Sequence, residues 1–472
     1  MPTEREYKEW QTKLRKSRRN RNSNHAIFWL FGLVLLSVLL SWKNNQQIYQ
    51  ERRGSDSLNR NIENTNPTVN RSYQNIVVGS INLINNINYA QIDNQAFSIH
   101  YQGDSVSELA KLLSQFASTE AEKARIIYSW IAYNITYDVP AFLSGNYGDT
   151  SPKGILKTRK SICSGYANLY KAVAKAMGLD ALVIDGYAKG VSYTINNTNE
   201  INHAWNAVKI NNGWYLVDAT WGAGNVNGGQ FSQKFNSYYF ATPPEQFIYD
   251  HFPSEKTWQF LTQPLTKKQF DLLPEVSSQF FKDGLRFVSH NTHTITASGR
   301  VDIILEADED TIITSELKQG GTSLEKTYTF EQKQNGKIFI SVAFPLSGTY
   351  DLNIFSKKRH EAGAYSHAVS YKIIANTTGE EFPLTYSNFI ESAAYLYTPL
   401  NKYLASNQSY YFKVNIPNAT DVQIIEPSSN NWTQLTRSGS VFEGNVDIGL
   451  GKILLAAKFS EDEKYWTLVE YN

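Results

Sequence analysis

The stretch SICSGYANLYKAVAKAMGLDALVIDGYAKG, residues 161–190, predicts a helix followed directly by a strand. The run CSGYANLYKAVAKAM is the helical part, and Gly178 is suited to end it just past the last turn, where the backbone turns left-handed. Residues 181–188 are expected to form the strand. Cys163, the single cysteine of the chain, therefore lies at the start of a helix.

Two further strands are expected at His203–Ile210 and Trp214–Asp218, joined by an Asn-Asn-Gly turn. In a hairpin with a two-residue loop, the residue numbers of two cross-strand partners add up to an odd number. His203 and Asp218 then point to the same face, because side chains alternate along a strand. Asp218 would lie opposite a residue two or four positions beyond His203. A helix followed by an antiparallel sheet indicates an α+β domain.

These placements predict a thiol site with Cys163 as nucleophile, His203 as base and Asp218 as the group that orients the base. A helix start favours a thiolate, and its N–H groups could hold an oxyanion. Gly165 would allow another segment to approach the first helical turn. Taken singly, each residue has a plainer reading: a small buried cysteine, a hydrogen-bonded core histidine and a turn or capping aspartate. Their combination favours the site.

The same segments resemble the transglutaminase-like superfamily. The C-x-G-Y-A-like nucleophile motif falls on residues 163–167, the H-A-W-N motif on 203–206 and the D-x-T-W motif on 218–221. The resemblance implies a papain-like α+β fold and an intact Cys–His–Asp triad of Cys163, His203 and Asp218. It also implies thiolate attack on a carbonyl, followed by acyl transfer to an amine or water. Ser161 departs from the pattern, because many relatives carry Gly two residues before the nucleophile.

Residues 239–261 and 264–274 resemble the segment that follows this core in kyphoscoliosis-peptidase-like proteins. Members of that subgroup carry immunoglobulin-like modules after the catalytic domain. We therefore assign a transglutaminase-like domain to residues 95–275. Helical spacing predicts one helix at 105–116 and a second over 121–135, with Ser118 or Thr119 as its N-cap. Alternating apolar runs separated by turn signals recur twice beyond residue 281. They predict two all-β sandwich modules, at residues 281–376 and 380–472.

The N-terminal part of the chain predicts a membrane anchor. Ala26–Trp42 is an uncharged apolar run near the lower length limit for a transmembrane helix. Eight Lys/Arg precede it and four lie within residues 43–60, so residues 1–25 are expected to be a basic cytoplasmic tail and the catalytic domain extracytoplasmic. A cleaved signal peptide and a buried helix are the alternatives. Residues 43–94 predict a polar tether, with one strand near Ile76–Ile84.

Composition limits the remaining functions. A net charge of +1 gives no general argument for binding nucleic acid, and one cysteine excludes an intrachain disulfide and every Cys-rich zinc pattern. His290 and His293 lack nearby carboxylates, so no metal or cofactor is expected. We predict a membrane-anchored cysteine peptidase or acyltransferase that acts on protein or peptide, with surface protein partners at the β-modules. A non-catalytic peptide- or protein-binding scaffold is the alternative.

Overall fold

The computed structural model describes residues 78–79, 84, 87–190, 200–460 and 463–472. The predicted tail, transmembrane helix and most of the tether lie outside these residues. Within the described ranges, no helix combines the length and apolar character needed to cross a bilayer. At the predicted strand near Ile76–Ile84, Val78 forms a parallel bridge with Trp214, and the N–H of Gly79 donates to the Trp214 carbonyl at 3.1 Å.

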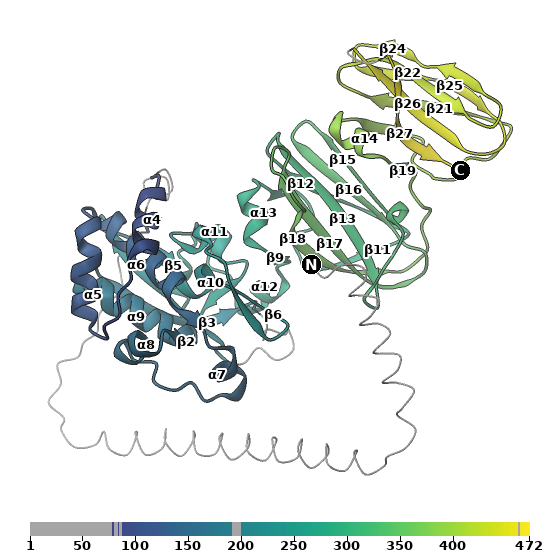
Figure 1. Ribbon diagram of the computed structural model, residues 1–472. Helices are drawn as coiled ribbons and strands as arrows, with labels where there is room; N and C mark the ends of the chain where they lie inside the picture. The colour runs from purple at the N-terminus through teal and green to yellow at the C-terminus, as the bar shows by residue number, and fades with distance from the viewer. Residues whose placement is uncertain (1–77, 80–83, 85–86, 191–199, 461–462) are drawn as a thin grey trace, which may run out of the picture. The chain divides into compact units, whose positions relative to one another are not determined.

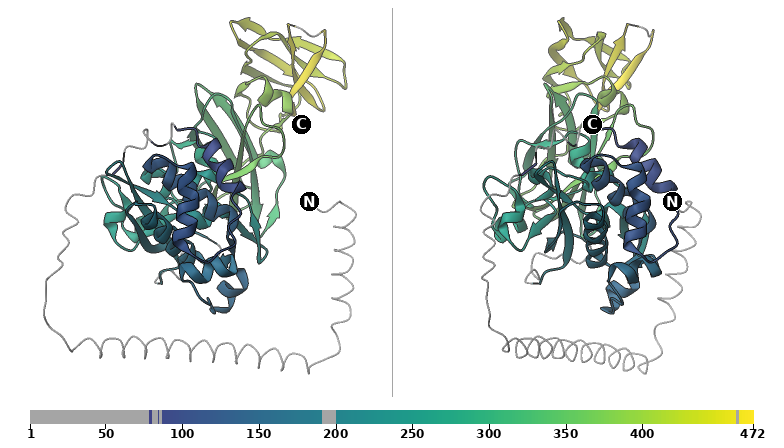
Figure 2. Two further views of the ribbon diagram at one scale, coloured as in Figure 1. Left: turned by 60° about the vertical axis from the view of Figure 1, so that its left-hand side comes forward. Right: turned by 90° about the vertical axis from the view of Figure 1, so that its left-hand side faces the viewer.

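The first domain places helices beside a four-stranded antiparallel sheet of order β5-β4-β3-β8 (Figures 1 and 2). Its strands are β3 Ala181–Ala188, β4 His203–Ile210, β5 Gly213–Val217 and β8 His251–Pro253. The helix α9 packs against β3 and β4. The helices are α4 Ala90–Ser98, α5 Val106–Leu113, α6 Glu120–Asn134, α7 Val139–Ser144, α8 Pro152–Thr158, α9 Cys163–Ala176, α10 Ala219–Ala223, α11 Pro244–Phe247 and α12 Lys267–Leu272.

Short elements complete this domain. They are the strands β1 Thr136–Tyr137, β2 Lys160–Ser161, β6 Gly224–Asn227 and β7 Gln230–Gln233, and the 3-10 helices η1 Ser114–Phe116, η2 Ser237–Tyr239 and η3 Lys256–Gln259.

Local sequence signals fix the helix and hairpin that carry the site. Gly178 has φ +82°, so α9 ends as the sequence predicts. Asn211 and Asn212 have φ values of 48° and 67°, which suit the two central positions of a type I′ turn. The resulting two-residue loop pairs Ile210 with Gly213 and sets the register of β4 against β5.

The first domain includes residues that lie before the predicted boundary at residue 95. The helix α4 begins at Ala90, inside the stretch 43–94 that the sequence assigned to a tether. Only Ala96 of this helix is buried, so most of its residues are polar and the segment has the composition of a tether. Asp93 nevertheless anchors the helix, since its carboxylate accepts from Nε and Nη2 of Arg125 at 2.8 and 2.7 Å.

The second part of the chain forms a β-sandwich with an immunoglobulin-like strand arrangement. One sheet has the order β10-β12-β16-β15 and the other β11-β18-β17-β13-β14, with β11 parallel to β18. The elements are β9 Glu275–Val276, α13 Ser278–Lys282, β10 Arg286–Phe287, β11 Thr294–Ala297, β12 Arg300–Glu306, β13 Thr311–Gln319, β14 Thr322–Ser323, η4 Lys326–Tyr328, β15 Thr329–Gln334, β16 Lys337–Ala343, β17 Gly348–Lys358 and β18 Ser366–Ala375.

This module also begins before the predicted residue 281. The strand β9 pairs with β18, and Val276 and Phe280 belong to the module's buried core. The strand is only two residues long, which is too short to show alternation.

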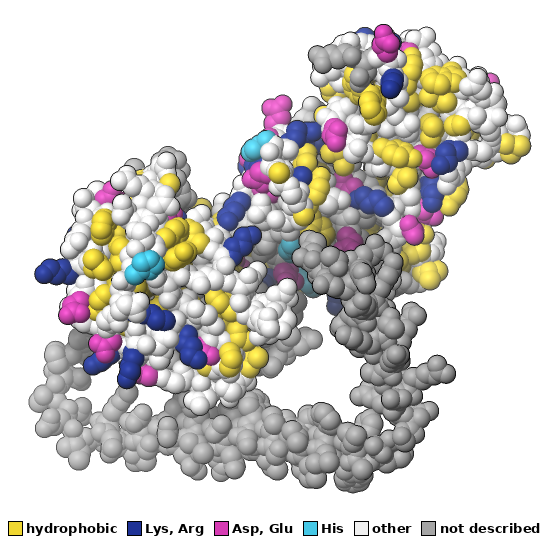
Figure 3. All heavy atoms as spheres, viewed as in Figure 1, with side chains coloured by type: hydrophobic (Ala, Val, Ile, Leu, Met, Phe, Trp, Pro, Cys, Tyr) yellow, Lys and Arg dark blue, Asp and Glu magenta, His cyan; other side chains and the backbone are white. Residues whose placement is uncertain are grey.

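The last part of the chain is a second sandwich. Its sheets have the orders β19-β27-β26-β22-β23 and β20-β21-β25-β24. The elements are β19 Leu384–Thr385, α14 Ser387–Glu391, β20 Tyr395–Thr398, β21 Gln408–Asn415, β22 Ala419–Glu426, β23 Asn431–Gln434, β24 Thr436–Ser438, β25 Val441–Ile448, β26 Ile453–Phe459 and β27 Tyr465–Tyr471. On the face that Figure 3 shows, basic and acidic side chains are interspersed among the described residues.

Candidate active site

Cys163 is the first residue of α9 and its side chain is nearly buried, with 8% of the residue exposed. Ile162 precedes the helix and provides no side-chain cap. No side chain at the cap therefore competes for the N–H groups of the first turn.

Ser161 packs against the first turn of α9 through the position of Gly165. A Cβ on Gly165 would lie 1.9 Å from Oγ of Ser161. The glycine is therefore required by close approach. The contact also shows how the chain accommodates Ser161 at a position where many relatives carry Gly. Ser161 is 4% exposed and occupies the space that the missing side chain of Gly165 leaves.

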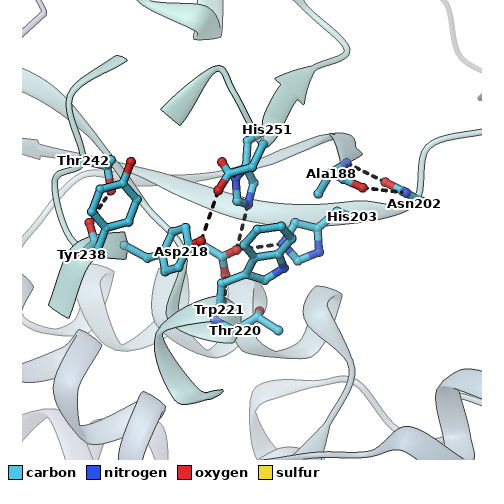
Figure 4. A network of polar contacts seen from close by, with 11 residues as sticks. Ala188, Asn202, His203, Asp218, Thr220, Trp221, Tyr238, Thr242 and His251 are labelled. Atoms are coloured by element: carbon cyan, nitrogen blue, oxygen red, sulfur yellow. Dashed lines mark hydrogen bonds and ion pairs between the residues drawn. The ribbon is translucent and has the colours of Figure 1, made fainter. Parts of the chain in front are cut away.

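His203 opens the strand β4 and faces Asp218 across the hairpin. The register Asn206↔Val217 places Asp218 beside Trp205, two positions beyond His203 as the alternation predicts. Nε2 of His203 lies 2.8 Å from Oδ2 of Asp218. Asn202 fixes the strand just before His203, because its side chain bonds to the backbone N–H and carbonyl of Ala188 at 2.8 and 3.0 Å (Figure 4).

Asp218 is fully buried, and both of its carboxylate oxygens accept hydrogen bonds. Oδ1 accepts from the backbone N–H groups of Thr220 and Trp221 at 2.8 and 3.1 Å, so Asp218 also caps the helix α10. Oδ2 faces Nε2 of His203 and Nε2 of His251, the latter at 3.0 Å. Asp218 therefore has both predicted roles: it caps a helix, and it is the hydrogen-bond partner of His203.

The charges of this pair stabilise each other. Burial by itself would lower the pKa of His203, but the carboxylate of Asp218 and the nearby sulfur of Cys163 raise that pKa to about 10. Burial would raise the pKa of Asp218, and the two histidines hold it well below its usual range instead. Because Nε2 of His203 is bound to Asp218, Nδ1 is the ring nitrogen left for Cys163. The pair therefore favours an imidazolium beside an ionised carboxylate.

His251 is a member of this cluster that the sequence reasoning missed. It lies at the start of β8 and is completely buried. Its Nδ1 is 2.6 Å from Oδ1 of Asp250, whose Oδ2 accepts from the hydroxyl of Tyr239 at 3.1 Å. No spacing rule links residues 218 and 251. The available signal was the Asp-His pair in the run IYDHFP. This run lies in the segment 239–261 that resembles kyphoscoliosis-peptidase-like proteins, but no role was assigned to it.

The His203, Asp218 and His251 set has the residue types of a metal site. A tetrahedral ion with ligands at about 2.0–2.2 Å would hold neighbouring ligand atoms about 3.4 Å apart. Asp218 Oδ2 instead lies 2.8 Å from one imidazole nitrogen and 3.0 Å from the other, which are hydrogen-bonding distances. The spacing fits a hydrogen-bonded cluster better than a metal centre.

A cleft of about 580 Å³ opens beside His203. One part of its lining is apolar and comes from Tyr137, Val139, Phe142, Leu143, Val226 and Phe231. Another part is polar and comes from Lys189, Asn202, Glu275, Ser277, Ser278 and His367. Burial lowers the pKa of Lys189 to about 8, against the opposing pull of nearby carboxylates. The cleft therefore offers both apolar and charged contacts to an extended ligand, although Cys163 does not line it.

Comparison with known proteins finds two family models that match successive parts of the chain. The family model of the transglutaminase-like superfamily matches residues 107–219, and that of the KY-like, immunoglobulin-like domain matches residues 267–386. Mouse kyphoscoliosis peptidase is 34% identical over 280 residues, which are 57% of this chain and 41% of that protein. Hillarin of Drosophila melanogaster is 28% identical over 302 residues, 57% of this chain and 37% of that protein.

The chain therefore spans less than half the length of these curated relatives. A crystal structure of a TGase matches at 20% identity over 40% of this chain and 41% of that chain, with a TM-score of 0.20, which is too low to add to the argument. Taken together, the matches show a transglutaminase-like domain at residues 107–219 followed by a KY-like, immunoglobulin-like domain at residues 267–386, the pair of domains expected for the kyphoscoliosis-peptidase-like subgroup.

Proposed function

We propose that this protein is a thiol-dependent acyltransferase or peptidase that acts on protein or peptide substrates. The observation that carries the proposal is the arrangement of Cys163, His203 and Asp218. A cysteine at a helix start adjoins a histidine whose other ring nitrogen is held by a buried carboxylate at 2.8 Å. These are the parts that a thiol nucleophile needs: a site favourable to negative charge, a base, and a group that orients the base.

In this mechanism the Cys163 thiolate attacks a substrate carbonyl and forms a C–S bond. The N–H groups at the start of α9 would hold the oxyanion that develops. His203 then donates its proton to the leaving amine as the C–N bond breaks, and a thioester remains. An amine or a water molecule next attacks the thioester, gives its proton to His203 and releases the sulfur. Asp218 stays ionised and keeps the imidazole in the required orientation.

The test is digestion and labelling of a peptide library, in the presence and absence of a primary amine, by the wild type and Cys163→Ala. We expect products only with the wild type, and an amine adduct would assign transfer rather than hydrolysis. We expect His203→Ala to lose most of the product as well, and His360→Ala, which removes an exposed histidine, is the control for that variant. Equal product formation by the wild type and Cys163→Ala would contradict the proposal.

The membrane anchor is a proposal of its own, which rests on the apolar run Ala26–Trp42 and its basic flank. We expect added protease to degrade the chain beyond about residue 43 in intact cells or spheroplasts, while residues 1–25 are protected. Complete protection of the C-terminal bulk would contradict the proposed anchor and orientation.

A binding scaffold is the second candidate function, and the burial of Cys163 favours it. Only 8% of the residue is exposed, and the cleft is lined by His203 but not by Cys163. In this case the cleft would grip a peptide and the β-modules would contact surface partners. Peptide binding would be equal in the wild type and Cys163→Ala, and Cys163 would react with iodoacetamide no faster than an ordinary thiol.

A further inference from the structure

His251 lies between two carboxylates in the interior of the first domain. Its Nε2 is 3.0 Å from Oδ2 of Asp218, and its Nδ1 is 2.6 Å from Oδ1 of Asp250. The side chains of His251 and Asp218 have no exposed surface, and that of Asp250 is 8% exposed. Figure 4 shows His203 and His251 directed at the same carboxylate.

The hydrogen-bond partners determine the protonation state of His251. A neutral imidazole carries one N–H group, whereas an ionised carboxylate can only accept. The remaining oxygens of the two acids are also acceptors: Oδ1 of Asp218 takes two backbone N–H groups, and Oδ2 of Asp250 takes the hydroxyl of Tyr239. When both carboxylates are ionised, both nitrogens of His251 have to donate, which makes the ring an imidazolium.

Aromatic rings and a few charged groups surround His251. Phe247 stacks on its ring at 4.1 Å between centroids, and Trp221 and Trp205 lie at 4.5 and 5.1 Å. The other polar or titratable rings that face it are His203 at 5.3 Å and Tyr239 at 5.9 Å. Lys189, which directly follows β3, interacts electrostatically with Asp250. Burial opposes a charge on His251, but the carboxylates of Asp250 and Asp218 raise its pKa.

We propose that His251 is a positioning residue, a permanent buried cation that keeps Asp218 ionised and aimed at His203 while His203 gains and loses its proton. The role in turnover rests on the function proposed above. The reaction requires His203 to become neutral when it donates its proton to the leaving amine. At that moment Asp218 would be a buried carboxylate without a cationic partner. The imidazolium of His251 supplies the missing countercharge.

The sign of the effect follows from this charge. A cation beside Asp218 makes it easier for His203 to release its proton, because the carboxylate remains compensated. Removal of the His251 charge should therefore raise the pKa of His203. If His251 were uncharged and only filled space, its replacement would leave the pKa of His203 unchanged. The pKa of His203 therefore distinguishes an electrostatic role of His251 from a packing role.

The experiment is NMR titration of ¹⁵N- and ¹³C-labelled histidine rings in the full chain. It uses the Cys163→Ala background, because loss of the sulfur removes one of the influences that raise the pKa of His203. His203→Ala and His251→Gln assign the two resonances, and His360→Gln is the matched control at an exposed histidine. In the Cys163→Ala chain we expect both ring nitrogens of His251 to be protonated at pH 7, because the two carboxylates raise its pKa above the ordinary value. A neutral His251 at that pH would overturn the proposal.

In His251→Gln we expect the pKa of His203 to rise by about one unit or more relative to Cys163→Ala alone, and not to move in His360→Gln. An unchanged or lowered pKa of His203 would refute the proposal. If His251→Gln does not fold, the protonation state of His251 in the Cys163→Ala chain still decides the question. If the wild type shows no turnover with any peptide, the proposed function fails, but neither NMR result depends on turnover.

Discussion

Asp218 binds His203 through Oδ2 at 2.8 Å and caps α10 through Oδ1, so one carboxylate joins the end of the β4–β5 hairpin to the imidazole. The two residues are fifteen positions apart, and the two-residue Asn-Asn loop sets the register that brings them together. In the proposed function, the reactivity of Cys163 therefore depends on residues that are distant in the sequence.

The first prediction concerns that reactivity. His203→Ala should slow alkylation of Cys163 by iodoacetamide at neutral pH toward the rate of an ordinary thiol, because the imidazolium that stabilises the thiolate is lost. Turnover should fall by about 10²–10⁴-fold. Asp218→Ala should leave some activity, because the Cys–His pair remains. Cys163 is the only cysteine, so the total alkylation rate measures this site. An unchanged rate in His203→Ala would show that the two side chains are not coupled.

The second prediction is the pH dependence of stability. Because the pKa of His203 is raised to about 10 in the folded chain, its contribution is complete below about pH 6.5 and is lost as the pH rises toward 10. The pKa of Asp218 is held well below 3.8, so its contribution is complete above about pH 3.8 and is lost as the pH falls through the folded value. The difference in Tm between the wild type and Asp218→Asn should therefore be largest between about pH 4 and 6.5.

A thermal melting series from pH 3 to 10 measures this difference, with Asp104→Asn, at an exposed and weakly paired carboxylate, as the control. A Tm difference that is constant over the series would mean that Asp218 contributes through packing alone.

The sequence was informative where the interactions are local. The start of α9 at Cys163, its end at Gly178 and the hairpin register all follow from short-range rules on capping, glycine and turn residues. Those rules were sufficient to place His203 and Asp218 on one face. They could not place Cys163 beside His203 without the family resemblance, because that contact depends on how α9 packs against the sheet.

The residues that could not be predicted are placed by contacts between segments far apart in the sequence. His251 reaches Asp218 because β8 pairs with β3, at Ala188↔His251, across more than 60 residues of chain. The start of the domain was missed for a related reason, since Asp93 has no local signal and its partner Arg125 lies on another helix. The single-pass anchor stays a prediction, because residues 26–42 lie outside the described part of the chain.

The third prediction tests the boundary at α4. Asp93→Ala should destabilise the first domain by about 3 kcal/mol or more, because it leaves the nearly buried guanidinium of Arg125 without its carboxylate. Ser129 also donates to Asp93, at 2.5 Å. Asp104→Ala should cost less than about 0.5 kcal/mol, since Asp104 is exposed and 3.9 Å from Lys153. Urea unfolding measures both. Equal effects would show that α4 adds little to the domain.

The fourth prediction tests where the first β-module begins. A fragment of residues 273–472 should melt cooperatively with a β-type circular dichroism spectrum. A fragment of residues 281–472 should melt at a lower temperature, because it lacks the buried Val276 and Phe280 and the β9–β18 pairing. Loss of a buried Phe side chain costs about 3–5 kcal/mol in general. Identical melting of the two fragments would place β9 and α13 outside the module's stable core.

The fifth prediction concerns the contact between Ser161 and Gly165 at the start of α9. Alanine is normally better than glycine inside a helix by about 1 kcal/mol. Here Gly165→Ala should instead destabilise the protein by about 1–3 kcal/mol, because the new Cβ would lie 1.9 Å from Oγ and 2.8 Å from Cβ of Ser161. The third neighbour, Cδ1 of Ile155 at 2.9 Å, is the end of a flexible side chain and can move.

The double variant Ser161→Gly/Gly165→Ala removes both serine atoms from that contact, so it should recover most of the stability that Gly165→Ala loses. Ser161→Gly alone is the control, and urea unfolding of all four proteins gives the coupling between the two positions. The alkylation rate of Cys163 should follow the same order, since a displaced first turn would move the sulfur away from His203. Additive effects would mean that the two side chains do not compete for the same space.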